Sequence, residues 1–298
     1  MRAGGVATLL AGALVHTTIA GGEGPMPPPS PPDITKMRIV YRVPGMDRVR
    51  VERNRVYREV AGSRLEMDVY SPPEATRGAP LPVVILIHGG PVPPGASAKN
   101  MGVFLSYGEL LAASGLKAVT FSHRFYGPGA LADAAGDVAA AVAHVRDHAE
   151  ELGIDRDRVA LWAFSGGGPF LSQPLRERWP FVRAIAAYYA VLDLQVPPPG
   201  AAGGIADDTR RGFSPLHHLA AVGESLPPLL VARAGRDNPW LNATIDRFVA
   251  EALARNVPLE LMTHPAGQHG FDVLDDDGRS REIIARTLDF LKYHLRRP

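Results

Sequence analysis

The chain has 298 residues, 46% of them hydrophobic, and its 32 basic and 31 acidic residues leave a net charge of +1. No basic block stands out, so neither nucleic acid nor an acidic membrane surface is expected as a partner. The chain has no cysteine, which excludes disulfides, thiolate metal sites, cysteine nucleophiles and a lipoprotein anchor.

The first segment has the features of an export signal. Arg2 precedes an apolar, small-residue run from Val6 to Ala20, and Thr18-Ile19-Ala20 has the small-x-small form of a cleavage site. We therefore expect residues 1–20 to be a signal peptide, which would make the protein secreted or periplasmic. The run is shorter than the roughly 18 apolar residues that span a bilayer, so stable membrane insertion is not expected.

The alternative for this segment is a start at Met26 or Met37, which would leave the protein in the cytoplasm. Residues 21–36 differ in composition from the rest of the chain, with six prolines between Pro25 and Pro32. Such a stretch can form neither a helix nor a central strand, so we expect an extended linker. Residues 37–298 would then form one domain, because α/β folds of about 250 residues often do.

The domain begins with alternating apolar and polar residues, which indicate strands that have one solvated face. These stretches are 38–42, 49–52, 57–60 and 65–70. The next stretch, Pro82 to His88, is apolar nearly throughout, as in a parallel strand that is buried on both faces. The first strands are therefore expected to be antiparallel and to lead into a mostly parallel sheet.

Helical and strand patterns alternate from there to the end of the chain. Helices are expected at 104–113, 131–152, after 165 to about 178, 241–254 and 280–295, and strands at 117–122, 159–164, 182–192, 228–232 and 259–263. Repeated βα units predict an α/β sheet with helices on both faces. The long connection from Asp193 to Leu226 is either a partial lid over the site or a surface excursion.

The most informative stretch surrounds Ser165. The apolar strand from Val159 to Phe164 ends at this serine, three glycines come directly after it, and a helical pattern continues from there. Glycine permits the close backbone approach that a sharp strand-to-helix reversal needs. A serine at such a reversal presents its hydroxyl above the sheet, where the first N–H groups of the helix also point. Ser165 is therefore a candidate nucleophile, and the alternative is an ordinary N-cap serine.

A serine hydroxyl needs a base within hydrogen-bond reach and a third group that orients the base. Asp237 and Asp193 each follow a strand and are the candidate acids. His264 at a strand end and His269 in a glycine-flanked loop are the candidate bases, and the loop residue can more easily reach a serine. The order Ser165, Asp237, His269, each after its own strand, favours this set. The alternatives are a helix N-cap for the aspartate and a solvated loop position for the histidine.

An anion-stabilising loop is expected at the end of the strand before residue 89. Backbone N–H groups of Gly89 and Gly90 could approach an oxyanion closely, and the N–H of Gly166 would supply another donor. Pro91 has no N–H, so Gly90 is the better donor of the two in the loop. His88 is expected to brace the loop rather than to act as a base.

These motifs, in this order, give the chain a resemblance to the α/β-hydrolases, close to the carboxylesterase, acetyl-esterase and dienelactone-hydrolase-like groups, over roughly residues 57–296. The motifs are His88-Gly-Gly, the elbow at Ser165, Gly235-Arg-Asp237 and His269-Gly-Phe271. The resemblance implies an α/β-hydrolase fold and a serine hydrolase that acts on a small-molecule ester. It also implies that Ser165 is the nucleophile, His269 the general base and acid, and Asp237 the orienting acid.

Two positions depart from the family pattern. Ala163 stands where glycine usually opens Gly-x-Ser-x-Gly, and Pro91 stands where esterases often have the third glycine of His-Gly-Gly-Gly. His-Gly-Gly-Pro is instead familiar in serine peptidases of the prolyl-oligopeptidase type, but the 87 residues before His88 cannot hold their β-propeller. The alternative functions are a serine acyl-peptidase or amidase without a propeller and a catalytically inactive hydrolase-fold binding module.

The sequence implies neither a metal nor an organic cofactor, because no metal-ligand spacing accompanies the pair His217-His218. It does not reveal acyl or alcohol specificity, which depends on the shape of the pocket. Trp240 and Phe271 either line that pocket or pack in the core. The oligomeric state is not readable from the sequence.

Overall fold

The computed structural model describes residues 33–296 apart from 61, 74–78, 197–204 and 220–225. The expected signal peptide, residues 1–20, and most of the expected linker, residues 21–36, lie outside the described residues. The end of the linker, Ile34–Lys36, forms one short 3₁₀ turn that is capped by the carboxylate of Asp33.

A mixed sheet lies at the centre of the described residues. Its strands are β1 Arg50–Val60, β2 Ser63–Ser71, β3 Leu81–Ile87, β4 Lys117–Phe121, β5 Ile154–Phe164, β6 Val182–Tyr188, β7 Leu229–Ala234 and β8 Leu259–His264. They are ordered β1-β2-β4-β3-β5-β6-β7-β8. β2 pairs antiparallel with both β1 and β4, and the remaining pairs are parallel. The expected antiparallel strands before a parallel sheet are therefore confirmed.

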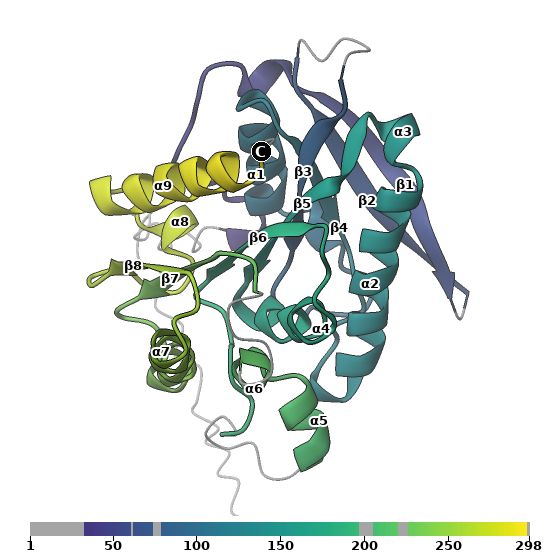
Figure 1. The fold of residues 1–298 in the computed structure, drawn as a ribbon. Helices are drawn as coiled ribbons and strands as arrows, with labels where there is room; N and C mark the ends of the chain where they lie inside the picture. The colour runs from purple at the N-terminus through teal and green to yellow at the C-terminus, as the bar shows by residue number, and fades with distance from the viewer. Residues whose placement is uncertain (1–32, 61, 74–78, 197–204, 220–225, 297–298) are drawn as a thin grey trace, which may run out of the picture. The chain divides into compact units, whose positions relative to one another are not determined.

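Helices cover both faces of this sheet. They are α1 Gly102–Ala113, α2 Leu131–Asp147, α3 Ala149–Leu152, α4 Ser172–Glu177, α5 Asp207–Gly212, α6 Pro215–Leu219, α7 Pro239–Ala254, α8 Phe271–Leu274 and α9 Gly278–His294. α1 and α9 lie against one face, and α2, α4 and α7 lie against the other (Figure 1). Within the described part of the chain, no helix combines the length and the apolar character that crossing a bilayer requires.

The apolar strands are buried because helices cover them on both sides. Residues 83–87 of β3 and 159–164 of β5 are almost completely shielded from solvent, and Trp162 is the largest of the fully buried side chains. Burying one large apolar side chain stabilises the fold by about 1.5–3 kcal/mol, so this core fixes the sheet firmly. The carboxyl ends of β3, β5, β6, β7 and β8 share one edge of the sheet, because these strands run parallel.

Residues 38–42, expected as a strand, are not one. The N–H of Ile39 donates to the Ser106 hydroxyl over 3.1 Å, and the N–H of Val40 donates to the Asp272 carbonyl over 2.8 Å. The alternation in this stretch therefore reflects packing against α1 and α8 rather than pairing in a sheet.

Other boundaries differ from the sequence expectations for local reasons. The stretches expected at 49–52 and 57–60 form one strand, β1, which begins at Arg50 and whose register shifts twice. The helix expected at 131–152 is divided at His148 into α2 and α3. The strand expected at 182–192 ends at Tyr188, because Tyr189 adopts a left-handed φ of 37° that a strand cannot continue.

The long connection after β6 contains more regular structure than the sequence indicates. Its described residues include the short helices α5 and α6, and Leu216 N–H donates to the Leu192 carbonyl over 3.0 Å.

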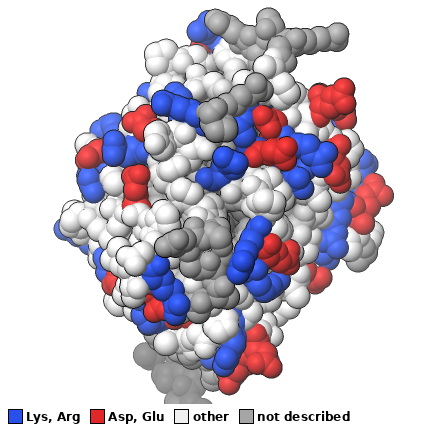
Figure 2. Space-filling view, viewed as in Figure 1, with Lys and Arg blue, Asp and Glu red and all other residues white. Residues whose placement is uncertain are grey.

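On the face of the molecule in Figure 2, basic and acidic side chains are interspersed, without a patch of one sign.

Candidate active site

Ser165 stands at a sharp turn between β5 and the 3₁₀ helix Ser165–Leu171. Its φ is 52°, a left-handed value that is strained for a residue with a side chain. The next glycines in the chain are needed because backbone approaches them closely. A Cβ on Gly167 would lie 2.7 Å from the His88 carbonyl oxygen, and one on Gly168 would lie 2.2 Å from the Val191 carbonyl oxygen. The turn therefore packs tightly against the backbone of His88 and Val191, and this packing holds the strained serine in place.

The residue at the first position of the elbow motif is also tightly enclosed. Ala163 is fully buried in β5, where it pairs with Ile87 on one side and Ala187 on the other. Alanine in place of the family's glycine thus leaves the turn intact.

His269 and Asp237 meet at the same edge of the sheet. Asp237 lies in the loop after β7, His269 lies in the loop after β8, and 2.7 Å separates His269 Nδ1 from Asp237 Oδ2. A carboxylate can only accept, so Nδ1 carries the proton and Nε2 of the neutral ring keeps its lone pair. The other carboxylate oxygen of Asp237 accepts from the Asn238 N–H over 2.6 Å. The Asp237 side chain is thereby fixed and only 4% exposed, whereas the His269 side chain is 43% exposed to solvent.

The competing acid, Asp193, is engaged elsewhere. One of its carboxylate oxygens accepts from Arg247 Nε over 2.8 Å, and the other accepts from the Gln195 N–H over 2.8 Å and from the Ser214 hydroxyl over 3.3 Å. These partners are all in the connection after β6 or on α7. Asp193 therefore ties that connection to α7 rather than orienting a histidine.

The competing base, His264, is also a structural residue. Its ring is 3% exposed, its Nε2 lies 3.1 Å from Asp277 Oδ2, and it packs against the Phe271 ring. Asp277 caps the start of α9, so His264 joins the end of β8 to that helix. Phe271 is fully buried and belongs to the core, and Trp240 donates its ring N–H to the Val196 carbonyl over 2.9 Å.

Tyr189 links the serine side of the rim to the histidine side. It directly follows β6, whose Tyr188 pairs with Phe164 of β5. Two residues after Tyr189, the Val191 N–H donates to the Ser165 carbonyl over 3.0 Å. The Tyr189 ring packs against the His269 ring with 4.6 Å between centroids. Sequence reasoning missed Tyr189, because a tyrosine at the end of an apolar strand carries no local signal of such a contact.

The glycine loop after β3 lies against the turn at Ser165. A Cβ on Gly89 would come within 2.8 Å of the Ser165 Cβ, and one on Gly166 would lie 2.4 Å from the Gly90 carbonyl oxygen and 3.1 Å from the Gly90 nitrogen. The Phe125 ring closes the other side of Gly90, 2.8 Å from where a Cβ would stand. The three glycines expected to stabilise an oxyanion are thus brought together beside Ser165.

A pair of buried histidines supports this loop. The His88 and His123 rings stack, and the Gly89 carbonyl accepts from His88 Nδ1 over 2.5 Å. His88 Nε2 accepts from the His123 N–H over 3.1 Å, and His123 Nε2 donates to the His88 carbonyl over 3.2 Å. Burial lowers the pKa of His88 to about 4 and lowers the pKa of His123 well below its usual value. Both rings are therefore neutral near pH 7, and His88 has the bracing position expected from the sequence.

A buried ion pair fixes the loop between β3 and α1, in which Ala98–Asn100 form a 3₁₀ turn. The Lys99 ammonium is 2% exposed and lies 2.9 Å from Asp68 Oδ1, while Asn54 Oδ1 accepts from it over 2.6 Å. A hollow of about 310 Å³ opens beside this loop, with Ser97 and Tyr126 among its lining residues. Because β2 begins and β4 ends at the edge that carries Ser165, this hollow belongs to the same rim.

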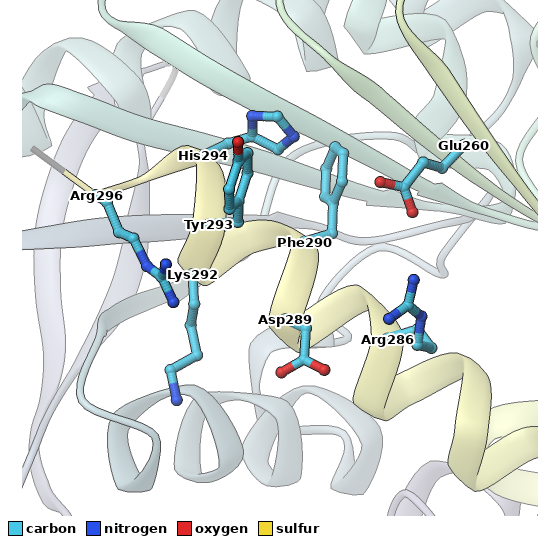
Figure 3. A pocket seen from close by; sticks show the side chains of 8 residues that line it. All are labelled: Glu260, Arg286, Asp289, Phe290, Lys292, Tyr293, His294 and Arg296. Carbon is cyan, nitrogen blue, oxygen red and sulfur yellow. The ribbon is translucent and has the colours of Figure 1, made fainter. Parts of the chain in front are cut away.

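Another hollow, of about 450 Å³, lies between the start of β8 and the last turns of α9. Carboxylates and basic groups are mixed along it, with Glu260 and Asp289 beside Arg286 and Lys292 (Figure 3). None of the candidate site residues lines it. Among the described residues, no group of three or more histidine, aspartate or glutamate side chains is arranged to hold a metal ion.

Comparisons with known proteins agree with this architecture. The BD-FAE family model matches residues 67–172, which include Gly89, Gly90 and Ser165 but end before Asp237. A comparison with curated protein sequences finds no match.

Solved structures of esterase 2 from Thermogutta terrifontis are similar over most of their length. The native esterase has a TM-score of 0.66 at 21% identity, covering 84% of this chain and 94% of the esterase. The paraoxon-phosphorylated form has a TM-score of 0.63 at 22% identity over the same shares. The apo form has a TM-score of 0.64 at 22% identity, covering 86% of this chain and 98% of the other. The expected α/β-hydrolase fold is thereby confirmed.

Proposed function

We propose that this chain, whose fold is that of the α/β-hydrolases, is a serine hydrolase that cleaves carboxylic esters through an acyl-enzyme. The 2.7 Å contact between His269 Nδ1 and Asp237 Oδ2 carries the proposal, together with the strained turn at Ser165 on the same edge of the sheet. The similar solved structures are esterases, one of them phosphorylated by paraoxon, which supports the same chemistry.

In the proposed reaction, Ser165 Oγ attacks the acyl carbon while its proton passes to His269 Nε2. Asp237 holds the ring in the tautomer that can take this proton and stabilises the imidazolium that forms. The oxyanion collapses, the bond to the alcohol oxygen breaks, and His269 gives its proton to the leaving group. Water then attacks the acyl-serine, with the same nitrogen as base, and the carboxylic acid leaves.

The oxyanion would be stabilised by backbone N–H groups of the glycines beside Ser165. Gly90 and Gly166 are the main candidates, and Gly89 lies against the serine itself. Losing one such donor typically costs about 3 kcal/mol of transition-state stabilisation. The neutral, buried His88 and His123 would hold these donors still during the reaction, so that little reorganisation is needed.

A panel of p-nitrophenyl acyl esters of increasing chain length, run beside aminoacyl p-nitroanilides, tests the proposal. Ester turnover should exceed anilide turnover and should vanish in Ser165→Ala. Preferential turnover of the anilides would favour the amidase or peptidase, for which the sequence His88-Gly-Gly-Pro91 is the specific indication.

A fluorophosphonate probe separates an enzyme from a binding module. It should label the wild-type chain at Ser165 and leave Ser165→Ala unlabelled. A folded wild-type protein that reacts neither with the probe nor with any ester would overturn the proposal.

Export to the periplasm or medium is proposed on the sequence of residues 1–20 alone, and an intact mass that corresponds to a chain beginning at Gly21 would support it.

A further inference from the structure

The carboxylate of Asp272 is buried three residues after His269 and is held by two tyrosines. Its exposure is zero, and both of its oxygens accept hydrogen bonds of 2.7 Å, one from the Tyr189 hydroxyl and one from the Tyr107 hydroxyl. Its backbone carbonyl accepts from the Val40 N–H over 2.8 Å. Asp272 therefore joins the start of α8 to α1, to the end of β6 and to the segment before β1.

Two hydroxyl donors on a carboxyl group favour its charged form, because a carboxylate accepts at both oxygens and a protonated acid must donate at one. Burial opposes this and leaves the pKa of Asp272 raised overall, while the hydrogen bonds from Tyr189 and Tyr107 counteract part of the effect. Burying a carboxylate costs free energy unless its oxygens are paired. We therefore expect the Asp272 carboxylate to serve a function that offsets this cost.

Tyr189 connects this carboxylate to the base. Its ring packs against the His269 ring, while its hydroxyl donates to Asp272. Its φ of 37° is a strained, left-handed value for an aromatic residue. Strain of this kind persists where the surrounding contacts determine it.

On the premise of the proposed function, we propose that Tyr189 and Asp272 form a second support for His269, opposite Asp237. Asp237 fixes Nδ1 of the ring, Tyr189 fixes its plane, and Asp272 fixes the tyrosine and places a negative charge close to the imidazolium that forms during turnover. Tyr189 and Asp272 are positioning residues, since neither is placed to touch the reacting atoms.

The charged and titratable groups around His269 come from three elements. Asp237 contacts it from the loop after β7, Tyr189 packs against it from the end of β6, and Asp272 of α8 interacts with it electrostatically and is joined to it through Tyr189. Next to it in its own loop, Gln268 is bound to Asp275, with Gln268 N–H donating over 2.9 Å. Replacing Asp272 by asparagine removes one negative charge from this set and keeps the side-chain shape.

The deciding readout is the titration of the His269 imidazole, followed by NMR in histidine-labelled protein and assigned by its loss in His269→Gln. Asp272→Asn should move the midpoint to lower pH by roughly half a unit or more, because the imidazolium loses a nearby anion. Tyr188→Phe is the matched control. It removes an equally buried hydroxyl from the neighbouring residue, one that hydrogen-bonds to Thr287 and to the Ile283 carbonyl rather than to Asp272. Its midpoint should equal the wild-type value.

Turnover provides the second readout. Tyr189→Phe keeps the ring and breaks the link to Asp272, so kcat should fall about tenfold while KM stays within twofold. Tyr188→Phe should retain the wild-type kcat. If circular dichroism shows that Asp272→Asn is unfolded, the kcat and KM of Tyr189→Phe decide whether the inference holds.

An unchanged His269 midpoint in folded Asp272→Asn would overturn the inference, as would equal losses of kcat in Tyr189→Phe and Tyr188→Phe. The two proposals fail differently. A wild-type protein that hydrolyses no ester refutes the enzyme assignment, whereas the NMR midpoint reports on Asp272 whether or not any ester is cleaved.

Discussion

The imidazole rings of His88 and His123 stack in parallel, with centroids 3.6 Å apart and an angle of 2° between their planes, at the base of the loop that carries Gly89 and Gly90. Each ring is bonded to the backbone of this loop or to its partner, so neither can rotate without breaking a hydrogen bond. Placing two neutral rings here gives the loop a rigid foundation and also makes its stability depend on pH.

We expect the native state to lose stability on acidification through this pair. Burial lowers the pKa of His88 from 6.5 to about 4 and also lowers that of His123, so the unfolded chain binds more protons between these values. The contribution is fully present above about pH 6.5 and is lost as pH falls toward about 4, on the order of 3 kcal/mol for His88. Urea unfolding at about pH 7 and pH 5 measures it.

His123→Phe provides the comparison, because phenylalanine keeps a stacked ring and cannot be protonated. The drop in unfolding free energy between the two pH values should be smaller in this variant. An identical drop would show that the acid sensitivity arises elsewhere.

Ester turnover should fall on the acid side for a different reason. Protonated His269 cannot accept the serine proton, whereas His88 and His123 stay neutral across the range where an ordinary histidine titrates. The acid limb of kcat/KM should therefore keep its position in His123→Phe, and a displaced limb in that variant would contradict this. A flat profile from about pH 5 to 8 would argue against His269 as the base.

The two candidate acids should separate clearly by substitution. Asp237→Asn removes the acceptor that fixes the His269 tautomer, so kcat should fall by roughly 10³–10⁴ with the fold retained. Asp193→Asn breaks the pair with Arg247 and should lower the melting temperature while folded protein keeps most of its kcat. Equal effects on kcat would mean that the acid is assigned to the wrong residue.

The buried pair of Lys99 and Asp68 should be sensitive to removal of one partner. Lys99→Met leaves the Asp68 carboxylate buried without its main counter-charge and should cost about 3–5 kcal/mol of unfolding free energy. Lys36→Met removes a lysine whose side chain is 83% exposed and should change stability by less than about 1 kcal/mol. Denaturant unfolding of both variants compares them, and similar values would refute the role of burial.

The glycines behind Ser165 should tolerate no side chain. Gly168→Ala would place a Cβ 2.2 Å from the Val191 carbonyl oxygen, so the turn must shift, at a cost of about 3 kcal/mol or more. Gly212→Ala, where a Cβ would meet open space, serves as the control and should be close to neutral. Retention of full fluorophosphonate labelling and stability in Gly168→Ala would contradict the packing of this turn.

Much of the fold could be predicted from local patterns. Continuous apolar runs such as 159–164 indicated buried parallel strands, and three glycines after Ser165 indicated the sharp turn. The boundaries of elements were less predictable where backbone groups bond to residues that are far away in the sequence. Residues 38–42 alternate like a strand, yet their N–H groups find partners on α1 and α8.

The sequence by itself determined the buried strands and the turn at Ser165, because these depend on propensities and periodicities that act over a few positions. It also gave the chain order of the candidate residues. The sequence favoured Asp237 over Asp193 by chain order alone, and the tertiary structure adds the partner of each. Both come after strands, and their partners Arg247 and His269 belong to other elements. The support of His269 by Tyr189 was likewise invisible to local patterns, because strand order and sheet packing bring together residues that lie far apart in the chain.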